Sequence, residues 1–144
     1  VQPTSAALVA NSVYLARIRP VDWITISTLH VYVVTTAAEN LDVAILDVAT
    51  GARLAGPAAP AAVAGSGTMQ GFTLVTPITL SPFVDYDFAV GSNGVPVVCR
   101  VSGIAAANDL TSRAQRKANY YSSGIPNPAT GAAADAALIW IAGT

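Results

Sequence analysis

The stretch Asn40–Leu54, NLDVAILDVATGARL, constrains the fold more than any other part of this 144-residue chain. In its first half Val43 and Ile45 fall on one face, as the two-residue period of a β-strand requires. Gly51 then supplies the positive φ that a short turn needs. The stretch therefore predicts a β-hairpin whose first strand lies in the core and whose second strand begins on the solvent side at Arg53.

The composition limits the classes of protein to which the chain can belong. Charged residues make up 10% of the chain and hydrophobic residues 53%, much of it alanine, with a net charge of -1. So few charges indicate either that neighbouring subunits cover part of the surface or that the protein is a compact, alanine-rich one, and both interpretations stay open. Clustered basic residues for phosphate contacts are lacking, as is an apolar run long enough for a spanning helix. We expect no nucleic-acid partner and no membrane insertion.

The run Trp23–Thr36 is the longest strand pattern in the sequence. Its apolar residues alternate in one register near Ile26 and in the opposite register from Leu29 onward. A slip of this kind, here at Ser27-Thr28, is typical of a β-bulge. We expect four side chains of the run to point inward and two outward; the inner set is Ile26, Leu29, Val31 and Val33, and the outer pair is His30 and Tyr32.

The rest of the chain consists of shorter patterns. Strand signals occur at Val13–Ile18, Met69–Leu80 and Ala137–Ala142, and the prolines and glycines of residues 56–67 predict a surface loop. Residues 85–101 contain two strand patterns around Gly-Ser-Asn-Gly, which predicts a second hairpin.

A short helix is predicted near residues 109–118. Asn108-Asp109 is a plausible N-cap, and basic residues follow in the later turns, where they suit the helix dipole. With about eight strands and this one helix, the sequence predicts an all-β, antiparallel β-sandwich of jelly-roll-like type. Residues 1–11 are expected to form an N-terminal arm, and residues 12–144 a single sandwich domain.

The order of these strand phrases resembles the small jelly-roll-like domains of bacteriophage virion proteins, especially tail-fibre, minor-tail and head-decoration modules. The phrases that carry the likeness are VYLARIRP, WITISTLHVYVVTTA, VAILD with TGARL, and TLVTPITLSPFVDYDFAV. Together they cover most of residues 13–144. The chain departs from the family pattern at Ala44-Ile45-Leu46, where Gly-Ile-Tyr is usual, and at Phe83-Val84, where a glycine usually follows Pro82. The resemblance implies the fold and a virion setting; it transfers no binding site.

Residues for catalysis or metal binding are scarce. One histidine and one cysteine, His30 and Cys99, are too few for a zinc site. No phosphate-loop, dinucleotide-binding or nucleophile-elbow motif occurs. Asp85 and Asp87 share a strand face, which is compatible with a calcium pair or a carboxylate dyad, although we favour a plain solvent-facing role. We expect no enzymatic activity, no cofactor and no metal.

Aromatic and basic side chains are the candidate contact residues. Aromatic faces stack on sugar rings or anchor protein interfaces, so Trp23, His30, Tyr32, Tyr120 and Tyr121 are candidates for exposed stacking surfaces. For Trp23 we favour the core or the sandwich rim. The basic cluster Arg113, Arg116 and Lys117 could bind an anionic glycan or an acidic neighbouring protein. Its plainer interpretation is the solvated end of a helix. The full candidate set is Tyr120, Tyr121, Tyr32, His30, Arg113, Arg116 and Lys117.

The expected function is that of a non-enzymatic bacteriophage structural protein, associated with the tail or a fibre and presenting loops to a host-surface glycan. Such a protein resides in the virion, is assembled in the host cytoplasm, and has other virion proteins as partners. The resemblance implies a homo-oligomer, with a trimer favoured. Two alternatives stay open: a capsid decoration or cement protein without receptor binding, and a carbohydrate-binding module.

Overall fold

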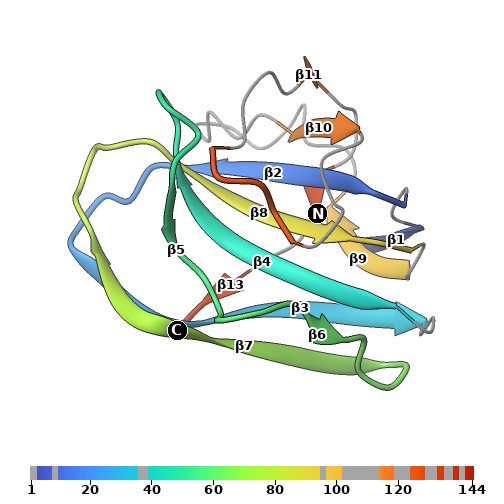
Figure 1. Ribbon diagram of the computed structural model, residues 1–144. Helices are drawn as coiled ribbons and strands as arrows, with labels where there is room; N and C mark the ends of the chain where they lie inside the picture. The colour runs from blue at the N-terminus through green and yellow to red at the C-terminus, as the bar shows by residue number, and fades with distance from the viewer. Residues whose placement is uncertain are drawn as a thin grey trace.

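The computed structural model is an antiparallel β-sandwich of two sheets (Figure 1). It describes residues 3–7, 10–35, 39–94, 97–101, 114–118, 124–128, 133–134, 138–139 and 142–144. All strand pairings among these residues are antiparallel. The predicted all-β class is confirmed, and the jelly-roll-like connectivity stays a prediction.

The first sheet is built around the long strand β3 (Ile24–Thr35). Strand β7 (Thr68–Leu80) pairs with one edge of β3, while β9 (Val97–Val101) and β13 (Ala142–Gly143) pair with the other. Strand β9 also pairs with β1 (Pro3–Ala7) and β12 (Leu138–Ile139). The C-terminal strand pieces β12 and β13 thus lie against the two central strands, β9 and β3.

The second sheet has the strand order β11-β10-β2-β8-β4-β5, with β6 also paired to β4. Its strands are β2 (Ser12–Ile18), β4 (Asn40–Asp47), β5 (Arg53–Ala55), β6 (Ala61–Ala62), β8 (Tyr86–Ser92), β10 (Ala114–Ala118) and β11 (Ala133–Ala134). The predicted hairpin is confirmed, because β4 pairs with β5 and Gly51 has a φ of 71° in the turn between them.

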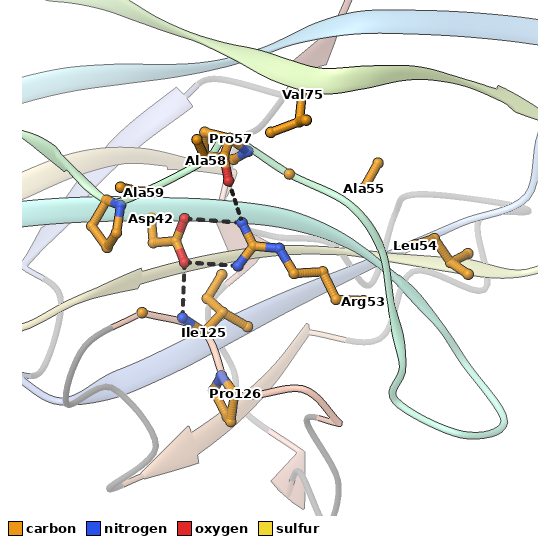
Figure 2. A pocket seen from close by; sticks show the side chains of 13 residues that line it. Asp42, Arg53, Leu54, Ala55, Pro57, Ala58, Ala59, Val75, Ile125 and Pro126 are labelled. Atoms are coloured by element: carbon orange, nitrogen blue, oxygen red, sulfur yellow. Dashed lines mark hydrogen bonds and ion pairs between the residues drawn. The ribbon is translucent and has the colours of Figure 1, made fainter.

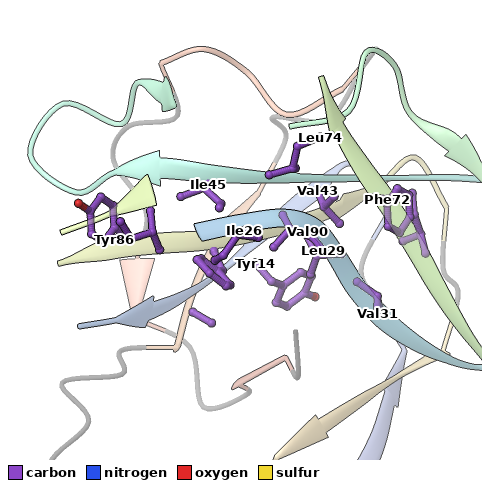
Figure 3. Close-up of a cluster of buried hydrophobic side chains, with 14 of the residues drawn as sticks. Tyr14, Ile26, Leu29, Val31, Val43, Ile45, Phe72, Leu74, Tyr86 and Val90 are labelled. Carbon is purple, nitrogen blue, oxygen red and sulfur yellow. The ribbon is translucent and has the colours of Figure 1, made fainter. Parts of the chain in front are cut away.

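The main core lies between the two sheets (Figure 3). Leu29 and Val31 from β3 meet Val43 and Ile45 from β4, and all four side chains are fully buried. The ladder between β3 and β7 shifts its register between Ile26 and Thr28, so the predicted bulge is confirmed. The inward set of β3 is also confirmed, because Ile26 and Val33 are buried too while His30 and Tyr32 are only half-buried.

A second apolar cluster covers the other face of β4. Ala44 and Leu46 are buried there together with Ile125, which belongs to a segment far away in the sequence. The remaining members of this cluster are Val13, Leu15 and Ala89. Because both faces of β4 are buried, its sequence is an almost continuous apolar run rather than a strict alternation.

The helix prediction near 109–118 is wrong for its second half. Residues Ala114–Ala118 form strand β10, which pairs with β2 from Ala114↔Ala16 to Ala118↔Ser12. Residues 109–113 lie outside the described residues. Helix propensity is a weak preference of a few tenths of a kcal/mol per residue, and here the ladder to the edge of β2 overrides it.

The second predicted hairpin is also wrong. Strand β8 continues through the predicted turn as far as Ser92, which pairs with Ser12 on one side and Leu41 on the other. Ser92 Oγ also donates to the Asn40 carbonyl at 2.9 Å, which holds this end of β8 in the ladder. Strand β9 belongs to the first sheet, so the chain crosses between sheets after β8 instead of folding back on it.

Two segments predicted to be irregular contain strands. The expected N-terminal arm contains β1, and the proline-rich loop 56–67 contains the two-residue strand β6. Of the thirteen strands in the described ranges, eight have five residues or more. The sequence predicts about eight strands, which agrees with the number of longer strands in the described ranges. Two of these longer strands, β1 and β10, were not predicted.

Candidate functional site

A cavity of about 600 Å³ lies beside β5 (Figure 2). It is bordered by β5 with the loop that follows it, by Val75 of β7, by Asp42 of β4 and by residues 124–126. The Val75 amide donates to the Gly56 carbonyl at 3.0 Å, which joins the edge of the first sheet to this loop. The volume falls within the range of about 300–1,000 Å³ that small-ligand sites occupy.

The polar part of this cavity is an ion pair between Asp42 and Arg53. Arg53 Nη1 donates to Asp42 Oδ2 at 3.1 Å and Nη2 donates to Oδ1 at 3.4 Å. The Asp42 side chain is 1% exposed and that of Arg53 is 21% exposed. Two backbone amides complete the carboxylate shell, that of Ile125 at 2.8 Å and that of Val43 at 2.9 Å. Such compensation is what allows a carboxylate to remain charged in a buried position.

Arg53 also binds the loop and the 124–128 segment. Its Nη2 donates to the Pro57 carbonyl at 3.1 Å, and its backbone amide donates to Asn127 Oδ1 at 2.9 Å. The expectation that Arg53 starts a solvent-side strand is therefore wrong for its side chain, which turns back onto Asp42. A Cβ at position 56 would collide with the Arg53 guanidinium, so Gly56 is required for this close approach.

The walls of the cavity are small and apolar. They consist of prolines, alanines and aliphatic side chains: Leu54, Ala55, Pro57, Ala58, Ala59, Pro60, Val75, Ile125 and Pro126. Among the lining residues that the structure describes, only Asp42 and Arg53 ionise, and they neutralise each other. The site can therefore hold an uncharged ligand, whereas acid–base chemistry there would first have to break the pair.

Of the predicted contact residues whose side chains the structure describes, neither lines this cavity. His30 and Tyr32 lie two positions apart on β3, and His30 Nε2 is 3.0 Å from Thr144 Oγ1. Arg116 and Lys117 belong to β10 in the other sheet, where they pair in register with Tyr14 and Val13. The other three candidates, Arg113, Tyr120 and Tyr121, lie outside the described residues.

Asp85 and Asp87 are partners of arginines. Arg17 binds Asp87 through two bonds of 3.0 and 3.1 Å, and Arg19 binds Asp85 through two bonds of 2.7 and 2.9 Å. The bonds from Arg19 lower the pKa of Asp85 below its ordinary value. The calcium and dyad interpretations do not fit these pairs, and the solvent-facing role fails for Asp87, which is buried. No group of three His, Cys, Asp or Glu residues in the described ranges could hold a metal ion.

The structure exposes two aromatic side chains that the sequence reasoning did not favour as exposed. Trp23, expected in the core or at the rim, is 64% exposed, and Phe83 is 72% exposed. Hydrophobicity alone predicts burial for both residues. The available signal was the presence of Phe83-Val84 at a position where the resembling domains have a glycine.

Comparison with protein-family models, with curated proteins and with solved structures finds no match for the chain. Over the described ranges, none of the structure forms a helix that is long and apolar enough to cross a membrane.

Proposed function

We propose that the chain is a non-catalytic structural and binding module of a bacteriophage virion, associated with the tail or a fibre, and that its cavity beside β5 takes a neutral host-surface carbohydrate. The observation that carries the binding part is the neutral floor of the cavity, formed by Asp42 and Arg53 bonded at 3.1 Å. The virion part rests on the resemblance of the strand phrases.

The size and charge of the cavity favour a neutral ligand of one or two sugar rings. A ligand with a net charge would lose water on entering and would find no free counter-charge on the lining described above. The Nε–H of Arg53 takes part in none of the bonds between described residues, so it can donate to a ligand hydroxyl. Pro57, Pro60 and Pro126 offer apolar surfaces for the C–H face of a sugar ring.

The surroundings of the cavity favour binding over catalysis. A hydrolase or transferase needs a nucleophile or a general base within reach of the reacting atom. The described lining offers only Asp42 as a base, and this carboxylate already accepts bonds from Arg53, Val43 and Ile125. This arrangement supports the non-enzymatic interpretation.

The test is a glycan-array screen of the purified chain, repeated with Val75→Arg and Met69→Arg. Val75 is 70% exposed at the cavity, and Met69 is 47% exposed on the same strand but does not line the cavity. We expect the wild type and Met69→Arg to retain the same neutral glycans and Val75→Arg to lose them. Equal binding by all three proteins would contradict a site in this cavity.

The two alternatives give different results in the same screen. A protein that binds no glycan but attaches to phage heads would be a capsid decoration protein. A carbohydrate-binding module would bind glycans and remain a monomer at every concentration tested.

A further inference from the structure

Two loops are joined by a hydrogen bond and an ion pair at one end of the sandwich, on the left in Figure 1. The first joins β2 to β3 and the second joins β7 to β8. The Phe83 amide donates to the Pro20 carbonyl at 2.8 Å, and the Arg19–Asp85 pair joins the same two loops at 2.7 Å. The side chains that these loops carry are therefore held in a fixed relation to one another.

This end of the molecule is apolar and exposed. Five of the eight exposed large hydrophobic side chains in the described structure gather here, and we call them the end patch: Val21, Trp23, Ile24, Phe83 and Val84, which are 79%, 64%, 44%, 72% and 44% exposed. Single exposed hydrophobic residues are normal on a monomer, whereas a group of this kind marks an interaction surface.

The backbone at Phe83 favours a role for the end patch beyond the folding of the monomer. Its φ is 61°, in the left-handed region that a residue with a Cβ occupies at a cost and that glycine occupies freely. The ring is mostly in solvent, so packing inside the chain does not repay that cost. Strain at an exposed side chain of this kind is characteristic of functional positions.

The polar groups beside the end patch argue against a sugar as its occupant. Arg19 and Asp85 bind each other through two bonds, and Asp22 Oδ1 accepts the Trp23 amide at 2.7 Å. Sugar recognition needs several free donors and acceptors beside the aromatic ring, and the pair already takes up both carboxylate oxygens of Asp85 and two of the three guanidinium nitrogens of Arg19. The aliphatic members of the end patch fit an apolar protein surface instead.

We propose that the end patch binds the end patch of a second copy of this chain. Its rim keeps one charged atom of each sign outside the bonds between described residues, Arg19 Nη1 and Asp22 Oδ2, so the same rim on another copy is complementary to it. The net charge of -1 adds almost no long-range repulsion between copies.

The area of the end patch agrees with this occupant. A whole aromatic side chain presents roughly 150–250 Å², so two mostly exposed rings and three aliphatic side chains leave on the order of 500 Å². Each partner in an interface of standard size buries about 800 Å². The apolar centre together with its charged rim approaches that size.

This proposal rests on the proposed function in that a virion structural protein would act as an assembly of copies. An end patch that binds the same patch of a second copy closes a dimer, in place of the trimer that the resemblance favours. The proposal can fail independently, because association is measured without glycan. Loss of glycan binding leaves the mass of the assembly unchanged, and a monomeric protein can still bind glycan in the cavity.

The experiment is light scattering over micromolar to millimolar concentrations on the wild type, Phe83→Gly, Trp23→Ser and Met69→Ala. We expect the wild type and Met69→Ala to associate with the same dissociation constant, and both end-patch variants to raise that constant about tenfold or more, as expected for the loss of a central ring. Phe83→Gly should melt no lower than the wild type, because glycine relieves the strain while keeping the amide bond to Pro20.

A wild type that stays monomeric at the highest concentration would overturn the proposal, as would end-patch variants that associate like the wild type. Binding of glycans or of an unrelated protein through Trp23, without self-association, would also overturn it. Trp23→Ser keeps the proposal testable if Phe83→Gly fails to fold, because the Trp23 side chain is mainly in solvent.

Discussion

Arg53 Nη1 lies 3.1 Å from Asp42 Oδ2 across the β4–β5 hairpin, and the carboxylate that it binds is almost completely buried. The same guanidinium reaches the Pro57 carbonyl, and the same carboxylate accepts the Ile125 amide. One ion pair thus joins the β4–β5 hairpin and the loop after it to a segment 83 residues away in the sequence. The same segments border the cavity of the proposed site.

Breaking the ion pair should destabilise the fold strongly. We expect Asp42→Ala to lower the free energy of unfolding by about 3 kcal/mol, because it leaves the Arg53 charge without its partner. The double variant Asp42→Ala/Arg53→Met should cost less than the sum of the two single variants by about 1–2 kcal/mol. Urea denaturation of the four proteins measures this coupling, and strict additivity would contradict it.

Adding a methyl group at Gly56, beside the Arg53 guanidinium, should also lower the free energy of unfolding. Gly56→Ala places a methyl group against the guanidinium, so we expect a loss of about 1–3 kcal/mol from overpacking. Gly65→Ala is the matched control, because its Cβ would meet only Thr68 Oγ1, at 3.6 Å. Measured by thermal unfolding, the free energy of unfolding of this control should lie within about 0.5 kcal/mol of that of the wild type. Similar losses in both variants would argue against a special role for Gly56.

Stability should fall in acid. Hydrogen bonds from Thr50 lower the pKa of Asp47, and those from Arg19 lower the pKa of Asp85, both from an ordinary value of 3.8. A carboxylate with a lowered folded pKa stabilises the fold above its unfolded pKa and loses this contribution as the pH falls through the folded value. We expect a constant free energy of unfolding from neutral pH to about pH 5, and a decline below about pH 4.

Thr50→Val tests the cause of the shift at Asp47. The variant removes the hydroxyl that donates to Asp47 Oδ1 at 2.6 Å and keeps the Thr50 backbone donor at 2.7 Å. The pKa of Asp47, followed by carboxyl NMR, should rise part of the way toward its ordinary value. An unchanged pKa would show that the hydroxyl is not the main cause.

The buried face of β3 should tolerate truncation poorly. Leu29 is fully buried in the main core, so Leu29→Ala should cost about 2–5 kcal/mol in the free energy of unfolding. Thr25 on the same strand is exposed, and Thr25→Ser, which keeps the hydroxyl that lies 2.9 Å from Thr79 Oγ1, is expected to stay within about 0.5 kcal/mol of the wild type. A small loss at Leu29 would contradict its place in the core.

Strand pattern and register were predictable where burial follows a two-residue period. The alternation through Val43 and Ile45, and the slip between Ile26 and Leu29, both follow from side chains pointing to opposite faces of a strand. Local signals failed where long-range pairing decides the structure. Residues 114–118 have helix-compatible chemistry but complete the ladder of β2, and Ser92 looks like a turn residue but bonds to strands on both sides.

The candidate site was less predictable than the fold. Asp42 lies in a run whose other members are apolar, and its need for Arg53 becomes clear only when the β4–β5 hairpin forms and segment 124–126 covers it. The cavity walls are prolines and alanines, residues that carry no chemical signal in a sequence. The aromatic residues of the candidate set are either on β3, as Tyr32 is, or outside the described residues, as Tyr120 and Tyr121 are.

The measurement that tests the central claim most directly is amide NMR during titration with a neutral glycan selected by the array. The amides of Gly56 and Ile125 line the cavity and should shift with saturable binding, while those of Trp23 and Phe83 in the end patch should stay in place. Shifts confined to the end patch, or no shifts at millimolar glycan, would contradict a carbohydrate site beside β5.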